Sequence, residues 1–150
     1  MNREAALKPQ RRHLRQMIER GGPVGALARL SQYSDRSGVV LDVGVNRGTI
    51  ALYLARLYPD LPIHLIEPIP AQCEYVRDRF ARFPTLRVHQ LALSDGNGQS
   101  DFHIADHLGS SSLFTNTGAE AARHSGHVTQ ETITVDLARL DDWCAAQGIS

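Results

Sequence analysis

The sequence predicts an α/β domain built on a parallel β-sheet, and three observations support this. Two short apolar runs, residues 39–43 and 63–66, lack the alternation of a half-exposed strand and are typical of strands buried on both faces. A helical pattern of apolar residues follows each run. Residues 86–93 alternate between apolar and polar side chains and predict a third strand. Strands that alternate with helices are typical of parallel sheets.

A glycine-containing loop, residues 42–48, joins the first predicted strand to the first predicted helix. Gly44 and Gly48 permit a sharp bend and the close approach of a ligand, because glycine has no Cβ atom. Thr49 is a candidate capping residue for the helix. The N–H groups of a first helical turn, with the positive end of the helix dipole, attract an anionic group. A strand, a glycine loop and a helix in this order predict a nucleotide-cofactor site.

The second predicted strand ends in a carboxylate, Glu67, about twenty residues after the loop, where doubly wound folds hold both ribose hydroxyls. The spacing Gly44-x-x-x-Gly48 lacks the middle glycine of the dinucleotide pattern. This argues against a pyrophosphate on the loop, and so against an NAD-dependent oxidoreductase. An amino-acid carboxylate or amine fits instead. The inferred ligand is an adenosine with a short zwitterionic tail.

A set of motifs occurs in one order along the chain: Asp42-Val43-Gly44-Val45-Asn46-Arg47-Gly48, Ile66-Glu67-Pro68-Ile69-Pro70, Ala92-Leu93-Ser94-Asp95, Ser111-Ser112-Leu113 and Leu140-Asp141-Asp142-Trp143. In order and spacing they resemble the motifs of the FkbM-type methyltransferase family, although that family usually has alanine where Val45 stands. The resemblance implies a Rossmann-like class I methyltransferase sheet with S-adenosylmethionine as cofactor. It also implies methyl transfer to an oxygen of a small molecule or glycan.

The resemblance and the loop together imply a cofactor site made by Asp42, Gly44, Val45, Asn46, Gly48, Glu67, Leu93 and Ser94. Asp42 is expected to steady the loop and the methionyl amine, the loop residues to form the floor, and Glu67 to hold the ribose. Leu93 or Ser94 is assigned to the adenine edge, because ligands of open α/β sheets lie outside the carboxyl ends of the strands.

The second half of the chain predicts an antiparallel hairpin extension. Residues 95–98 are explained as a turn, and residues 99–105 alternate as the second arm of a hairpin after it. Residues 130–137 alternate again and are expected to join the hairpin as an antiparallel strand. A short helix is expected from Leu140, ended by Gly148.

Two further residues are assigned to the core. The helix from Pro70 to about Phe83, which Pro84 ends, places Cys73 on its buried face. Trp143 is expected to anchor the last helix.

The polar segment 106–126 is expected to be a functional or disordered loop. The resemblance places a serine step, matched by Ser111 or Ser112, near the entrance of the methyl acceptor. Asp95 and His103 are the neighbouring candidates for a general base, and the catalytic residues stay unassigned.

Two other chemistries are not favoured. The pairs His103/His107 and His124/His127 have no convincing third ligand, so no metal is expected. Ser110–Ser112 lacks the G-x-S-x-G elbow of a serine hydrolase.

Composition excludes several classes of partner. The 150 residues predict one domain, residues 38–150, preceded by a helical extension, residues 1–37. Sixteen basic and sixteen acidic residues give no net charge, so neither nucleic acid nor a membrane surface is expected as a partner. The arginines of residues 11–20 are interpreted as a solvated helix face. Two cysteines without ligand spacing and no membrane-length apolar run predict a cytoplasmic protein.

The family pattern continues past residue 150 with a strand that carries an Asp-x-Glu-Gly step. The predicted sheet, in the strand order three, two, one, is therefore expected to be incomplete, with an unpaired edge on the first strand. A truncated chain or a homodimer explains that edge. A non-catalytic cofactor-binding module is the alternative to an active enzyme.

Overall fold

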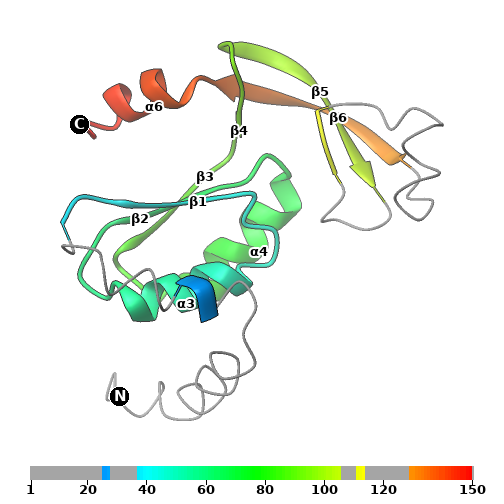
Figure 1. Ribbon diagram of the computed structural model, residues 1–150. Coiled ribbons are helices and arrows are strands. Elements are labelled where there is room, and N and C mark those ends of the chain that lie inside the picture. The colour runs from blue at the N-terminus through cyan, green and yellow to red at the C-terminus, as the bar shows by residue number, and fades with distance from the viewer. Residues whose placement is uncertain (1–24, 28–36, 106–110, 114–128, 150) are drawn as a thin grey trace.

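The computed structural model describes residues 25–27, 37–105, 111–113 and 129–149. These residues form an α/β structure with one parallel and one mixed β-sheet (Figure 1). Residues 25–27 are helical, and residues 1–24 and 28–36 of the predicted extension lie outside the described residues, so its boundary stays a prediction. None of the helices in the described part of the chain is long and apolar enough to cross a membrane.

The parallel sheet contains β1 (Val40–Val43), β2 (Ile63–Ile66) and β3 (Leu86–His89). The strand order is β1-β2-β3, and both pairs are parallel, which confirms the predicted sheet and its order. All residues of β2 are buried, as its apolar sequence predicts for a central strand. Among the described residues β1 pairs with β2 alone.

Two helices, α3 (Thr49–Leu57) and α4 (Pro70–Phe80), cover one face of this sheet (Figure 1). Pro70 stands in the first turn of α4, where its missing N–H removes no hydrogen bond. The helix α4 ends at Phe80, earlier than predicted, because the Phe83 N–H turns back to the Phe80 carbonyl at 2.8 Å. The prediction that Thr49 caps α3 is wrong: Gly48 is the N-cap, and no side chain caps the helix.

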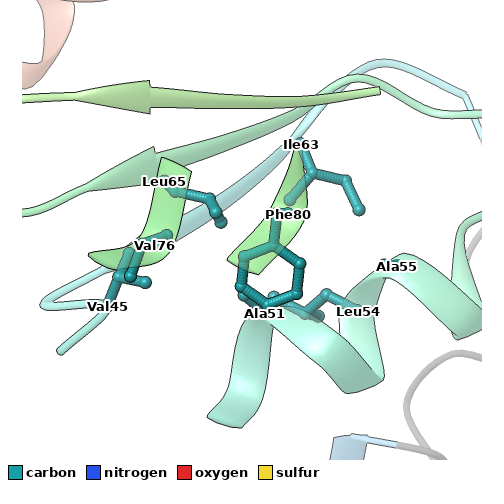
Figure 2. Packing of buried hydrophobic residues seen from close by; sticks show 8 residues of the cluster. All are labelled: Val45, Ala51, Leu54, Ala55, Ile63, Leu65, Val76 and Phe80. Atoms are coloured by element: carbon teal, nitrogen blue, oxygen red, sulfur yellow. The ribbon is translucent and has the colours of Figure 1, made fainter. Parts of the chain in front are cut away.

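The core between the parallel sheet and these helices is aliphatic, with one aromatic ring (Figure 2). Its buried members are Val45, Ala51, Leu54, Ala55, Ile63, Leu65, Val76 and Phe80. Alternate residues of a strand face the same side, so Ile63 and Leu65 point toward the helices and His64 points to the opposite face. Cys73 is fully buried, which confirms its assignment to the core.

The mixed sheet contains β4 (Ala92–Leu93), β5 (Gly98–Ala105) and β6 (Thr129–Ala138), in the order β4-β6-β5. The antiparallel pairing of β5 with β6 confirms that residues 130–137 join residues 99–105, and we call this pair the hairpin. The prediction that residues 99–105 pair with the strand before the turn is wrong, because β6 lies between β4 and β5. The prediction of one strand over residues 86–93 is wrong, since β3 ends at His89 and β4 pairs with the end of β6 instead. An alternating pattern does not reveal which partner a strand will choose, and here the chain changes partner within the pattern.

The last helix, α6 (Leu140–Ala146), lies on the face of the parallel sheet opposite α3 and α4 (Figure 1). Its Trp143 is buried, and the indole ring contacts the rings of His64 and His89 edge-on, with centroids 5.3 and 5.0 Å away. The prediction that Trp143 anchors this helix is confirmed.

Candidate functional site

The carboxyl ends of β1 and β2 carry the candidate site. The chain leaves β1 through a loop in which Gly44, Asn46 and Gly48 all have positive φ, of 78°, 50° and 72°. Three such residues within one loop produce the sharp bend that the glycines predict. Asn46 tolerates this conformation better than most residues with a side chain.

Glu67, which follows β2, faces this bend. Its side chain is 4% exposed. One carboxylate oxygen accepts the Asn46 N–H at 2.8 Å, and the other accepts the Ile69 N–H at 3.0 Å. A carboxylate has about four lone-pair sites, so roughly one on each oxygen remains for a ligand. The backbone fixes Glu67 in place without using up its capacity to bind.

Two cavities adjoin Glu67 and the bend. The smaller, of about 120 Å³, is lined by Gly44, Asn46, Glu67, Pro68, Ile69, Gln72, Phe102 and Ser111. The larger, of about 260 Å³, is mainly apolar and is lined by Val43, Gly44, Ile66, Pro68, Leu91, Ala92, Leu93, Phe102, Ser111, Ser112 and Leu113. The cavities share Gly44, Pro68, Phe102 and Ser111, so one ligand can extend across both.

The charge beside the bend is negative. Burial, together with the nearby Glu67 carboxylate, raises the pKa of Asp42 from 3.8 to about 6. The Asp42 Oδ2 atom is buried and has no hydrogen-bond partner among the described residues. A buried acceptor without a donor is costly, and two neighbouring carboxylates repel anions. This end of the sheet therefore favours a ligand that brings a positive charge or hydrogen-bond donors.

The backbone amides of the bend are used within the protein. The N–H groups of Gly44 and Val45 donate to the Ile66 carbonyl at 2.9 and 3.3 Å, and that of Gly48 donates to the Val45 carbonyl at 2.9 Å. With Asn46 bound to Glu67, four amides of the loop are engaged. These four amides are therefore not available to an anionic tail, because Ile66, Val45 and Glu67 accept them. The expectation that the N–H groups of the first turn of the helix attract an anionic group stays a prediction.

The two glycines of the bend have different surroundings. A Cβ atom on Gly44 would meet nothing within 4 Å, and Gly44 lines both cavities. A Cβ atom on Gly48 would clash with the Phe80 ring. Gly48 thus allows α3 and α4 to pack closely, and it lines neither cavity. Val45 is buried in the aliphatic core, with 5% of its surface exposed.

The remaining predicted residues also differ in whether they line a cavity. Leu93 lines the larger cavity. Ser94 donates its N–H to the Ala138 carbonyl at 3.0 Å and its hydroxyl to Asp95 at 3.2 Å. His103 bonds Thr132 across the hairpin at 3.1 Å and lines neither cavity. No general base emerges from Asp95 or His103, and a catalytic residue stays unassigned.

Sequence reasoning missed Gln72 and Phe102 as cavity-lining residues. Gln72 follows from its place on the first turn of α4, next to Glu67. Phe102 lies at the site because the hairpin folds over the site, and no local sequence pattern predicts this contact. His107, His124 and His127 lie outside the described residues, so the expected lack of a metal site stays a prediction.

This geometry defines an α/β domain with an acidic pocket at the carboxyl edge of a parallel sheet. Residues 42–150 match the family described as "Methyltransferase FkbM domain", so the chain belongs to this family, as the motifs indicate. The chain is also similar to 2-O-methyltransferase NoeI of Sinorhizobium fredii (strain NBRC 101917 / NGR234), with 29% identity over 118 residues. That match covers 74% of this chain and 48% of NoeI, so the chain spans about half the length of this relative.

Proposed function

We propose that this protein is an S-adenosylmethionine-dependent methyltransferase that methylates an oxygen of a small molecule or glycan. The family supports methyl transfer, and the similarity to a 2-O-methyltransferase supports an oxygen as acceptor. The observation that carries the proposal is the buried Glu67 carboxylate, which the backbone of the bend holds with lone pairs to spare. The parallel order β1-β2-β3 supports a Rossmann-like sheet with the cofactor at its carboxyl edge.

The residues present fit this cofactor in three respects. Glu67 can accept hydrogen bonds from the ribose hydroxyls. Gly44 leaves room for the ligand at the bend, and the unpartnered Asp42 oxygen, which is buried and lines neither cavity, can act on the methionyl ammonium group through water. The apolar cavity at Leu93 suits the adenine. When bound, the cofactor supplies a methyl group on a positively charged sulfur, which the two carboxylates favour electrostatically.

The same features disfavour a dinucleotide. A pyrophosphate needs free amides at the bend, and those of Gly44, Val45, Asn46 and Gly48 already donate within the protein. The pyrophosphate would also lie beside two carboxylates, Asp42 and Glu67, whose charge repels it. An NAD-dependent oxidoreductase is therefore the weaker candidate.

Two further properties belong to the proposal. Both cysteines are free thiols, which supports a reducing, cytoplasmic environment. The outer edge of β1 has no strand partner within the described residues, and Val43 at its end is 56% exposed, which supports pairing of that edge with another chain, as in a homodimer. Light scattering at several protein concentrations tests this association.

Isothermal titration calorimetry of the purified protein with S-adenosylhomocysteine and, separately, with NADH tests the cofactor assignment. We expect the first ligand to bind and the second not to bind. Glu67→Gln should weaken binding by about tenfold or more, because a charged acceptor is lost. The matched control is Glu74→Gln, an exposed carboxylate on α4, which should leave affinity unchanged. Tighter binding of NADH would overturn the proposal.

A methyl-release assay with glycan and small-molecule acceptors then tests turnover. Methylated product that requires Glu67 supports an enzyme. Binding of the cofactor without turnover of any acceptor would assign the chain to a cofactor-binding module instead.

A further inference from the structure

The hairpin brings a hydroxyl group to the same small cavity as Glu67. The isolated bridge between His103 and Ser112 holds the segment 111–113 against β5, with backbone hydrogen bonds of 2.8 and 3.0 Å. This pairing places Ser111 beside both cavities. Ser111 and Glu67 therefore line one space of about 120 Å³ although 44 positions of sequence separate them.

The hydroxyl of Ser111 is oriented by a backbone group. Its oxygen accepts the Ala105 N–H at 3.1 Å. A serine hydroxyl has one hydrogen to donate besides its two lone pairs, and among the described residues no acceptor is paired with that hydrogen. The Ala105 N–H occupies one lone pair of the Ser111 oxygen, so the hydroxyl hydrogen can point into the cavity.

The hairpin also makes the wall of the small cavity that carries Ser111 rigid, and we call this the hairpin wall. Phe102 of β5 is buried in a cluster with Ile69, Ala92 and Val135, and Phe102 lines both cavities next to Ser111. Ile69 is the residue whose N–H donates to Glu67. The hairpin wall and the Glu67 carboxylate are thus held by one apolar cluster, which fixes the distance between them.

We infer that Ser111 is a ligand-binding residue that, with Glu67, selects a sugar hydroxyl. A hydroxyl can accept the Ser111 hydrogen and donate its own hydrogen to Glu67 at the same time. The resulting chain runs from the Ala105 N–H through Ser111 and the ligand hydroxyl to Glu67 and the Asn46 N–H. Consecutive hydrogen bonds of this kind polarise one another and strengthen. An ammonium group has no lone pair for Ser111, and an ether has no hydrogen for Glu67.

This inference rests on the proposed function, because it takes the ribose of the cofactor as the sugar. Titration of S-adenosylhomocysteine into Ser111→Ala should show an affinity about fivefold lower than in the unsubstituted protein, the loss of one hydrogen bond. Ser111→Thr, which keeps the hydroxyl, should restore most of the affinity. Ser100→Ala removes an exposed hydroxyl from β5 of the same hairpin and should change nothing. Thermal unfolding of each variant checks that it is folded.

The 2′-deoxy and 3′-deoxy forms of S-adenosylhomocysteine identify the partner of Ser111. With the analogue that lacks the bonded hydroxyl, Ser111→Ala should cause no further loss, because the interaction is already absent. A fivefold loss that persists with both analogues, or unchanged affinity for the parent ligand, would overturn the role of Ser111. If the unsubstituted protein does not bind S-adenosylhomocysteine at all, the cofactor assignment fails instead, so the two failures are distinguishable. Should Ser111→Ala fail to fold, Ser111→Cys, whose thiol is a weak donor, decides the question with both analogues.

Discussion

The two faces of the parallel sheet are built from different chemistry. The face under α3 and α4 buries Ile63 and Leu65 against aliphatic side chains and Phe80. The opposite face carries His64 and His89, whose ring nitrogens lie 2.9 Å apart in a hydrogen bond, under the indole of Trp143. The packing of the first face therefore depends on shape and apolar area, and the packing of the second face depends on the protonation state of two imidazoles.

Each face also carries ionisable groups with displaced pKa values. Asp42 is in register with Leu65, so its carboxyl group lies on the apolar face, and burial raises its pKa. Burial lowers the pKa of both His64 and His89, and the charge of Arg87 lowers both further. For His89, the neighbouring His64 and Arg77 also lower the pKa. Because the two shifts favour different protonation states, acid should affect the stability of the two faces in opposite directions.

The largest expected effect is on the apolar face. Phe80→Ala should lower the free energy of unfolding by about 3–5 kcal/mol, because it removes a buried ring and leaves a cavity. Urea denaturation at pH 7.5 measures it. The control Tyr75→Ala changes a 48% exposed ring on the same helix and should cost under about 0.5 kcal/mol. Equal effects for the two variants would contradict the packing.

Substitutions of the two glycines of the bend distinguish a change in packing from a change in the candidate site. Gly48→Ala should cost about 2–3 kcal/mol of stability, because the new Cβ atom meets the Phe80 ring and the residue keeps a positive φ. Gly44→Ala should cost about 1 kcal/mol for its positive φ alone but reduce the affinity for S-adenosylhomocysteine more strongly. Denaturation and calorimetry on both variants measure the two effects. If Gly48→Ala impairs binding more than Gly44→Ala, at equal folded fraction, the assignment is reversed.

The different surroundings of Gly44 and Gly48 also show what the sequence alone cannot predict. Local patterns suffice for β1, α3, β2 and the position of Glu67, because burial, helical periodicity and the end of a strand are properties of neighbouring residues. They do not distinguish Gly44 from Gly48, since both simply lack a Cβ atom, and what a Cβ would meet depends on where α4 lies.

Long-range packing explains what else the sequence could not predict. Phe102 and Ser111 reach the candidate site through the pairing of the hairpin, far along the chain. The split between β3 and β4 has the same origin, because β6 supplies the partner for β4. Each of these features requires a contact between segments that no periodicity within either segment encodes.

Asp42→Asn should stabilise the protein at pH 8 by about 1–2 kcal/mol. The pKa of about 6 lies above the ordinary 3.8, so the stability from this group is present below pH 3.8 and is lost as the pH rises through 6. One pKa unit corresponds to about 1.4 kcal/mol, and partial solvent contact reduces the total. Asparagine carries no charge to bury, so the gain should vanish at pH 4. The same variant should bind S-adenosylhomocysteine more weakly if Asp42 receives the ammonium group. A gain that is the same at pH 8 and pH 4 would show that desolvation of the carboxylate is not the cause.

The smallest effect concerns the histidine face, and it has the opposite sign. Because the pKa values of His64 and His89 lie below the ordinary 6.5, their contribution to stability is present above pH 6.5 and is lost as the pH falls through the lowered values. Protonation of both rings removes the acceptor of their mutual hydrogen bond and places two charges under Trp143.

Unfolding measured from pH 8 to pH 4.5 should therefore show two opposing slopes in the unsubstituted protein. The variant His64→Leu/His89→Leu should retain the Asp42 slope alone, with stability that rises on acidification, whereas Asp42→Asn should become less stable on acidification. His103→Ala, on the hairpin away from both faces, is the matched control for loss of an imidazole and should follow the unsubstituted protein. Parallel pH profiles for the double histidine variant and Asp42→Asn would show that the two faces do not respond to acid separately.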